Sequence, residues 1–452
     1  MLYQMSVLFG WPLFLQRFAK RLGFVLYRFF YMTIQHVNWQ INGTAEKIRE
    51  SRRPENYDRC AQVLDIVSFN QFDNVQHGSI EDYILSHNRF ENPKYIFDND
   101  HISLITINEE NAIFGAAKQK GRHLWKLDYC SFMRKTEVLN SNQLILVPLN
   151  HFHRMAEELG DPKGQLIFLF STGRCGSTLL LQMIQTTGKC ISISEPDSTS
   201  SLALWYKNKG DSPQLRQLCR DVVRWTCRPY KNFTPMAYML KIMPLYTYAL
   251  PIFRDTYPQS KCLFMYRNVI KVAQSIYRIS RGSPILIMAS ALGKLSAMFT
   301  EGCFDYVGYL GKEFRYRLRD DLSLGVVMAA VNCKLYVEFR LNGHAVSAVR
   351  YEDIMEDKHF AAREILKFCD LPISFEEDFL RGLESDSQPN SVVTRKMASA
   401  HVDPPLTPEL ERLANLNLKK NNLPIIGDDW LLEGTITKND RHSKTQPNGI
   451  RG

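Results

Sequence analysis

The sequence predicts an α/β protein: a parallel sheet flanked by helices, preceded by an accessory region of short strands and helices. After residue 164, apolar runs alternate with amphipathic segments: QLIFLF, KCISIS, AYMLKIM, KCLFMY and HAVSAVRY, most of them followed by a helical pattern. Such alternation is typical of parallel strands joined by helices that cover both faces of the sheet. Between residues 63 and 150, short alternating runs such as HISLITIN and QLILVPLN indicate strands joined by polar loops instead.

Length and composition fit one large α/β domain with an accessory region. The chain has 452 residues, of which 45% are hydrophobic and 23% charged, as in an ordinary globular protein. Its net charge of +9 suits a polyanionic ligand or a membrane surface, but is too diffuse to indicate nucleic acid. The ten cysteines show no C-x-x-C pair and no zinc spacing, so we expect core residues and neither a metal site nor a disulfide framework.

Residues 1–50 form a basic and apolar N-terminal segment. Its stretch VLFGWPLFL, residues 7–15, is too short to span a bilayer, and no acidic residue precedes Glu46. Three interpretations of residues 7–34 stay open: a helix lying on anionic lipid, a helix docked on the protein's own body, and a short signal anchor. On a helix, four basic residues fall within about a third of the circumference. They are Arg17, Lys20, Arg21 and Arg28.

The rest of the chain divides into three parts. Residues 51–160 make an accessory region of unknown role, which opens on the polar, linker-like stretch SRRPENY. Residues 161–432 make the main domain. Residues 433–452 are polar, and we expect them to form a disordered tail.

The stretch FSTGRCGSTLLLQ, residues 170–182, predicts a strand, a tight loop and a helix. Gly173 and Gly176 let the backbone turn and bring N–H groups toward an anion at the helix N-terminus. Arg174 adds a permanently charged clamp, and Ser177 and Thr178 add hydroxyl donors. The lysine of the usual phosphate-binding pattern G-x-x-x-x-G-K-[ST] is missing. We favour anion binding over the alternative, a turn whose glycines serve geometry alone and whose arginine is solvated.

A second candidate segment is CLFMYRNVIKVAQSIYR, residues 262–278. An apolar strand ends at Arg267, and Asn268 is a suitable cap for the helix that follows. Ser275 lies about two turns into that helix, so its hydroxyl and Arg267 can converge on one phosphate. Taken alone, the segment also fits an ordinary strand end followed by an amphipathic helix.

A third segment begins at AVRYEDI, where a strand ends in Arg350 and a helix starts with Tyr351, Glu352 and Asp353. Acidic residues at a helix N-terminus stabilise the helix dipole. We therefore expect this segment to support the site and to take no part in its chemistry.

In this order, the three segments resemble those of the sulfotransferases that use 3′-phosphoadenosine-5′-phosphosulfate. GRCGST is similar to their 5′-phosphosulfate loop, which carries Lys or Arg followed by x-G-[ST]-[ST]. YPQSKCLFMYRNVIKVAQSIYR is similar to their 3′-phosphate motif, and RYEDI with the later FCDLP resembles a third family segment. The resemblance covers roughly residues 165–430. It implies a P-loop-like sulfotransferase fold over residues 161–432 and metal-free transfer of a sulfuryl group to an acceptor hydroxyl.

The resemblance also implies roles for single residues. Arg267 and Ser275 would hold the 3′-phosphate, and Arg395 is the candidate in SVVTRKM, residues 391–397, where the family has a loop that closes over the adenosine. Seven residues would cradle the 5′-phosphosulfate. They are Gly173, Arg174, Cys175, Gly176, Ser177, Thr178 and Leu179.

Three departures from the family pattern stand out. The C-terminal loop of residues 391–397 lacks the glycine-rich pattern of the cytosolic enzymes. Asn268 and Val269 replace the usual Asp-Pro after the arginine, which leaves the backbone path into that helix open. Arg174 replaces the lysine of the cytosolic enzymes, which places the chain nearer the Golgi and bacterial branches.

Sulfuryl transfer needs a base for the proton of the acceptor hydroxyl, and related branches use a glutamate or a histidine. Glu195 follows the second predicted strand, where its carboxylate can lie at the mouth of the cleft. The alternative, an acidic loop residue before Pro196, stays open. His151 and His153 lie just upstream of the first strand, and we expect them on a connecting helix.

Lys241 lies near the end of the third strand, and its K-x-x-P context resembles a stretch found in several sulfotransferases. A cation there can neutralise charge that develops on the bridging oxygen. Lysines at strand ends more commonly reach into solvent, and we favour that interpretation slightly. The catalytic candidates are Arg174, Glu195 and Lys241.

Two other classes remain open: a P-loop nucleotide kinase or NTPase, and an inactive sulfotransferase-like binding protein. The missing G-K-[ST] and the missing metal-binding aspartate count against a kinase. The acceptor is not identified, and a carbohydrate is our first expectation by analogy with the arginine-loop branches. A Golgi, endomembrane or membrane-associated location is slightly favoured over the cytoplasm. The glycosylation patterns at Asn42 and Asn232 do not decide this question.

Overall fold

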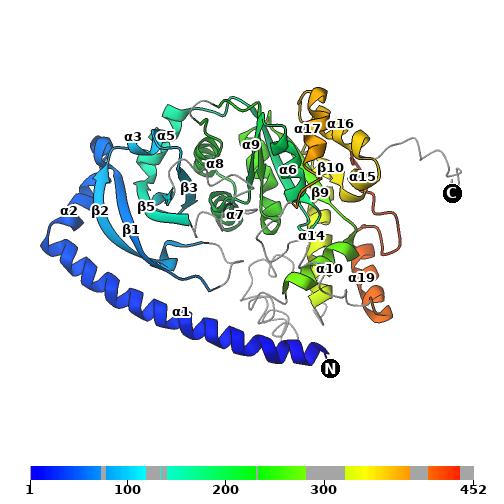
Figure 1. Ribbon diagram of the computed structural model, residues 1–452, viewed down its shortest axis with the longest axis horizontal. Coiled ribbons are helices and arrows are strands. Elements are labelled where there is room, and N and C mark those ends of the chain that lie inside the picture. The colour runs from blue at the N-terminus through cyan, green and yellow to red at the C-terminus, as the bar shows by residue number, and fades with distance from the viewer. Residues whose placement is uncertain are drawn as a thin grey trace, which may run out of the picture.

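The computed structural model describes residues 2–72, 78–118, 133, 140–230, 233–280, 321–386 and 406–437. The described chain contains two five-stranded sheets, one in the N-terminal part and one in the middle of the molecule (Figure 1). The expected fold class is confirmed: a parallel sheet flanked by helices follows an N-terminal region of strands and helices.

All strands of the central sheet run parallel, in the order β10-β9-β6-β8-β7. They coincide with the five apolar runs of the sequence. Their bounds are β6 Gln165–Ser171, β7 Cys190–Ser194, β8 Ala237–Lys241, β9 Lys261–Tyr266 and β10 Ser347–Arg350.

Helices cover both faces of this sheet. One face carries α7, α8, α9, α10, α14 and α19, and the other carries α6, α15, α16 and α17. Their bounds are α6 Ser177–Thr186, α7 Asp197–Lys209, α8 Pro213–Thr226, α9 Leu250–Thr256, α10 Val269–Ser280, α14 Asp321–Leu341, α15 Tyr351–Glu356, α16 Lys358–Phe368, α17 Glu376–Arg381 and α19 Pro408–Lys420. Short 3₁₀ turns are η3 Pro244–Ala249 and η4 Ile373–Phe375.

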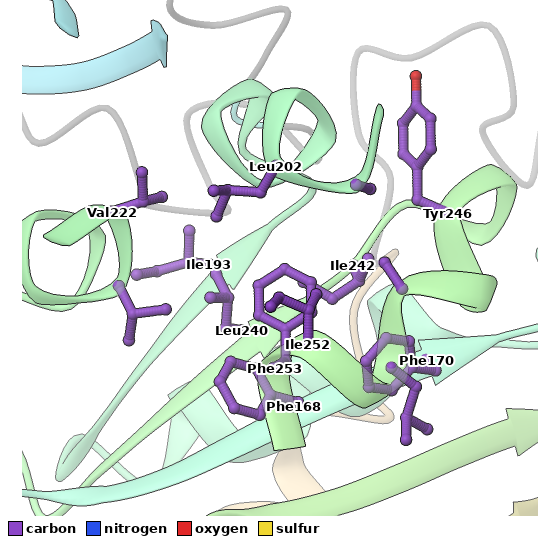
Figure 2. Close-up of a cluster of buried hydrophobic side chains, with 14 of the residues drawn as sticks. Phe168, Phe170, Ile193, Leu202, Val222, Leu240, Ile242, Tyr246, Ile252 and Phe253 are labelled. Carbon is purple, nitrogen blue, oxygen red and sulfur yellow. The ribbon is translucent and has the colours of Figure 1, made fainter. Parts of the chain in front are cut away.

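Alternate residues of each strand belong to two separate hydrophobic cores, one on each face of the sheet. Phe168 and Phe170 of β6 pack with Leu240 of β8 and with Phe253 of α9 on one face (Figure 2). Ile167 and Leu169, between them in sequence, belong to the core on the other face. This period of two, with both sets apolar, is what a parallel sheet buried on both faces requires.

The N-terminal sheet is antiparallel, in the order β2-β1-β5-β4-β3. One of its faces joins the core under α5, α7 and α8. The stretch 51–57, expected to be a linker, is folded: it ends α2 and begins η1. Buried Tyr57 donates to Glu158 at 2.9 Å. The bounds are α2 Thr44–Ser51, η1 Pro54–Arg59, β1 Ala61–Phe69, η2 Ile80–Asp82, β2 Tyr83–Glu91, α3 Lys94–Phe97, β3 Ile102–Ile107, β4 Asn111–Ala117, β5 Ser141–Pro148 and α5 Leu149–Leu159.

The first helix, α1 Leu2–Ile41, runs along the edge of the molecule (Figure 1). Arg28 and Gln35 donate to carbonyl oxygens of β2, and Arg21 forms an ion pair with Asp82 at 2.7 Å. Of the three interpretations of this segment, docking on the protein's own body is therefore the one that the structure shows. In the part of the chain that is described, no helix is long and apolar enough to cross a membrane.

The boundary expected at residue 432 lies too early. Thr435 bridges to Ala348 of β10, and the buried Thr437 hydroxyl donates to Asp353 at 2.9 Å. Residues 433–437 thus belong to the folded domain, because their hydrogen bonds complete the end of β10. Residues 438–452 lie outside the described residues.

A matched pair of glycines tests how α14 packs on α10. A Cβ at Gly325 would lie 2.5 Å from Ala273 Cα, whereas a Cβ at Gly23 of α1 would meet nothing within 4 Å. We expect Gly325→Ala to destabilise the protein by about 1–3 kcal/mol, because the helices cannot both keep their places. Gly23→Ala should instead stabilise by roughly 0.5–1 kcal/mol, because alanine is the better helix former. Thermal unfolding of both variants measures this; a stabilised Gly325→Ala would contradict the close packing.

Candidate active site

The loop after β6 has the backbone of an anion-binding turn. Gly173, Arg174 and Gly176 have φ values of 72°, 53° and 92°, and α6 begins at the next residue. Left-handed residues between right-handed ones gather backbone N–H groups into a concave site, here at a helix N-terminus. Glycine is required at 176 for a second reason, since a Cβ there would lie 2.5 Å from the ring of Tyr351.

Arg174 links this loop to the second candidate segment. Its Nε donates to Ser275 Oγ of α10 at 2.9 Å. The pKa of Arg174 is lowered to about 10, mainly by burial and in smaller part by the nearby Arg267 and Arg278, against Cys175 and Glu195, which raise it. Guanidinium groups gathered in this way favour an anion among them, because an anion relieves both their desolvation and their mutual repulsion.

Arg267 follows the last residue of β9. Its guanidinium lies 4.4 Å from the ring centre of Tyr351, and its Nε lies 3.8 Å from Glu352 Oε1. This Nε is buried, and it has no hydrogen-bond acceptor among the described residues. A buried donor without an acceptor is rare in native proteins, and it fits a place where a ligand oxygen binds.

The helix after Arg267 begins as expected, although Asp-Pro is missing. Asn268 Oδ1 accepts from Ile270 N at 3.0 Å, which is an N-cap bond. Asn268 N donates to Glu352 Oε1 at 3.1 Å. The cap prediction is confirmed, and in this chain the helix begins on an asparagine cap without an Asp-Pro pair.

Thr178, Lys241 and Glu195 form a buried polar chain. Lys241 Nζ donates to Thr178 Oγ1 at 3.1 Å and pairs with Glu195 Oε1 at 2.7 Å. The lysine side chain is 3% exposed and the glutamate 14%. Our preference for a solvent-reaching Lys241 was therefore wrong, because β8 lies between β6 and β7 and holds Lys241 between the loop and Glu195.

The two histidines lie on α5, the connecting helix that was expected, and their bonds lead away from the cleft. Buried His151 contacts Ser51 O through Nε2 at 3.1 Å, and burial lowers its pKa. His153 contacts Asp221 of α8 at 3.1 Å.

The remaining candidates divide by accessibility. Cys175 and Leu179 lie in the core under α6, so only their backbone N–H groups are suited to hold a ligand. Ser177 and Thr178 are buried at the start of α6. Arg395 lies outside the described residues.

The third segment supports the site, as expected. Arg350 Nε donates to Asp353 at 2.6 Å, and this pair anchors the end of β10. Tyr351 and Glu352 both contact Arg267, which was not predicted from the sequence. The strand-end position of RYED was a usable signal, but only once β10 is known to lie beside β9.

Among the described residues, no three His, Cys, Asp or Glu side chains are placed to hold a metal ion. The eight described cysteines are free and buried, as core residues are.

Fold and site together define an α/β enzyme with a phosphate-binding type of loop at the carboxyl end of its first parallel strand. The family model of the sulfotransferase domain matches residues 165–391, half of the chain. The chain belongs to this family and is a sulfotransferase.

Similar solved structures include a sulfotransferase domain from the curacin biosynthetic pathway, at 15% identity and a TM-score of 0.32, covering 56% of this chain and 97% of that one. A sulfotransferase from Alicyclobacillus acidocaldarius matches at 14% identity and a TM-score of 0.29, covering 57% of this chain and 93% of that one. Retinol dehydratase in complex with androsterone and inactive cofactor PAP matches at 12% identity and a TM-score of 0.28, covering 63% of this chain and 88% of that one. A search of curated proteins finds no significant match.

The buried ion pair makes a stability prediction that does not depend on activity. Glu195→Gln removes the partner of a lysine that is 3% exposed, so we expect a loss of about 2–4 kcal/mol of unfolding free energy. Adding Lys241→Met should restore most of this loss, because the double variant leaves no buried charge unpaired. Denaturant unfolding of the two single variants and the double variant gives the coupling energy. Additive losses would show that the pair is not formed in solution.

Proposed function

We propose that this sulfotransferase takes its sulfuryl group from 3′-phosphoadenosine-5′-phosphosulfate. The observation that carries the proposal is the Arg174–Ser275 bond together with the unsatisfied Nε of Arg267. The first joins the loop of β6 to the helix after β9, and the second offers a charged donor beside them. A ligand with two phosphate groups, one at each place, fits this arrangement better than a ligand with one.

In this proposal the loop of residues 173–178 binds the 5′-phosphosulfate through backbone N–H groups, hydroxyls and Arg174. Arg267 and Ser275 bind the 3′-phosphate. Ser275 then accepts from Arg174 on one side and donates to the phosphate on the other, so that each phosphate site holds the other in place. Arg395 remains the proposed contact from the C-terminal loop.

The donor supplies an activated sulfuryl group, and the chain's residues handle charge and proton. Lys241 is suited to stabilise the negative charge that forms on the leaving phosphate, since it already contacts Thr178 of the loop. Glu195 is suited to accept the proton of the acceptor hydroxyl. The two roles are compatible because a lysine that turns toward the phosphate releases the carboxylate with which it is paired.

A carbohydrate hydroxyl is the proposed acceptor, through the likeness of the arginine loop to the Golgi and bacterial branches. Labelled donor offered to carbohydrate, steroid, phenol and peptide acceptors tests this choice separately from donor binding. Transfer to a steroid or phenol alone would contradict the proposed carbohydrate acceptor and leave the proposed donor unaffected.

Thermal unfolding tests the donor site. We expect adenosine 3′,5′-bisphosphate to raise the melting temperature with no divalent metal present, because a ligand that binds only the folded state stabilises it. Adenosine 5′-phosphate, which lacks the 3′-phosphate, should raise it less. A rise that requires Mg²⁺, or a larger rise with ATP, would contradict the assignment and return the chain to the kinase-like class.

Arg267→Ala tests the 3′-phosphate site. The variant should bind adenosine 3′,5′-bisphosphate more weakly by about 1.5–3 kcal/mol, roughly ten- to a hundredfold, because it loses a charge-assisted bond. Adenosine 5′-phosphosulfate should bind the variant and the parent almost equally. Lys271→Ala, which removes an exposed cation of the same helix, is the control and should change neither affinity. Equal losses for both ligands would show that Arg267 is structural.

A further inference from the structure

Helix α1 differs from an ordinary surface helix in exposing a large apolar side. Its inward side packs Phe14 on Phe72 and Trp39 on His87, but it also makes polar contacts. Arg28 Nε donates to Tyr83 O at 2.9 Å, and Gln35 Nε2 donates to Leu85 O at 2.8 Å. Arg21 pairs with Asp82, which is 1% exposed. Surface helices usually place such residues in water and their apolar stripe on the core.

The reason for this orientation lies in the sheet that α1 covers. β2 is an edge strand of the N-terminal sheet, and an edge strand leaves alternate carbonyl groups without partners. Tyr83 and Leu85 are two residues apart, so their carbonyls point the same way and accept from Arg28 and Gln35. The strand edge therefore requires donors from α1, and the apolar side of the helix is left facing outward.

That outward side is a continuous apolar surface, which we call the outer face of α1. At 100° per residue its main members fall within an arc of about 140°. Phe29 and Phe30 are 63% and 61% exposed, and the other four are between 44% and 52% exposed. The six are Phe18, Leu22, Val25, Leu26, Phe29 and Phe30.

The outer face follows the helix axis. Exposed apolar side chains fill this arc from Leu15 to Phe30, roughly 20 Å along the helix, and exposed Thr33, His36 and Gln40 interrupt it farther along. A strip of this length on one side of a helix matches a flat surface that lies parallel to the axis. It does not match a helix that crosses a bilayer, which is apolar all round.

We propose that the outer face of α1 binds the surface of an anionic lipid bilayer, with the helix lying in the interfacial plane. Apolar side chains in such a helix enter the boundary between headgroups and acyl chains. Charge favours the same partner, because the chain has no acidic residue before Glu46 but carries Arg17, Lys20, Arg21 and Arg28. Asp82 neutralises Arg21, so the attraction rests on Arg17, Lys20 and Arg28, which lie within about a Debye length, ~10 Å, of the surface.

A second copy of the chain is the less suitable partner. A symmetric pair of α1 helices would bring two segments that carry only positive charge side by side, and like charges oppose such an interface. An anionic bilayer meets the same segment with the opposite sign of charge.

In this proposal the apolar outer face of α1 contacts the lipid, and the side that carries the four basic residues does not. Arg21 and Arg28 are bonded to the protein, so binding should depend mainly on the outer face and only secondarily on anionic headgroups. This distinction makes the proposal testable with substitutions on opposite sides of one helix.

Flotation of the full chain with vesicles of phosphatidylcholine and phosphatidylserine tests the proposal. The parent chain should float with the vesicles, and Phe18→Ser/Phe29→Ser should lower the partition coefficient by about tenfold or more, because two exposed rings are lost from the outer face. The control is Leu341→Ser/Leu416→Ser, which removes two exposed leucines of α14 and α19 and should bind like the parent. Both variants should keep the parent's melting temperature, since all four positions are exposed.

Three results would overturn the proposal. The first is a parent chain that does not float. The second is equal binding by the parent and the Phe18/Phe29 variant, which would show that charge alone holds the chain to lipid. The third is a parent that ignores vesicles and sediments as a dimer, which the Phe18/Phe29 variant dissociates; the outer face would then belong to a second copy.

Discussion

The parallel register of three strands brings Lys241, Glu195 and the loop after β6 together. Lys241, the last residue of β8, lies level with Leu169 of β6 and with Ser194 of β7. The loop of β6 and Glu195 therefore begin just beyond it on either side, and one lysine reaches both. A shift of the register by one residue would turn Lys241 to the opposite face of the sheet and separate all three groups.

This geometry gathers several positively charged groups in one place. Glu195 balances Lys241, and Glu352 lies beside Arg267, but burial and two neighbouring guanidinium groups still lower the pKa of Arg174. A protein maintains such a cluster only where the rest of the fold fixes it, here through the Ser275 bond and the ring of Tyr351. Clustered cations of this kind favour an anion among them, which is what the proposed donor would supply.

The local sequence pattern was sufficient to predict part of this arrangement. Alternating apolar runs identified all five strands of the central sheet, and the glycine spacing identified the loop, because both depend on short-range geometry. The exposure of Lys241 and the contacts of Tyr351 depend on strand order, which brings β8 between β6 and β7 and β10 beside β9. Nothing in the apolar pattern of a single strand encodes its neighbours. The folded state of residues 433–437 was not predicted for the same reason, since their partners lie on β10 and at the start of α15.

Helix α1 shows the same dependence on long-range contacts in a different form. Its sequence is amphipathic, and the rule that apolar residues face the core would turn Phe18 and Phe29 inward. The open edge of β2 reverses this outcome, because unpaired carbonyl groups bind Arg28 and Gln35 more specifically than an apolar side chain could. Covering the edge also prevents another strand from adding to the sheet. The consequence is an apolar surface on the outside of the protein, of the kind that marks an interaction site.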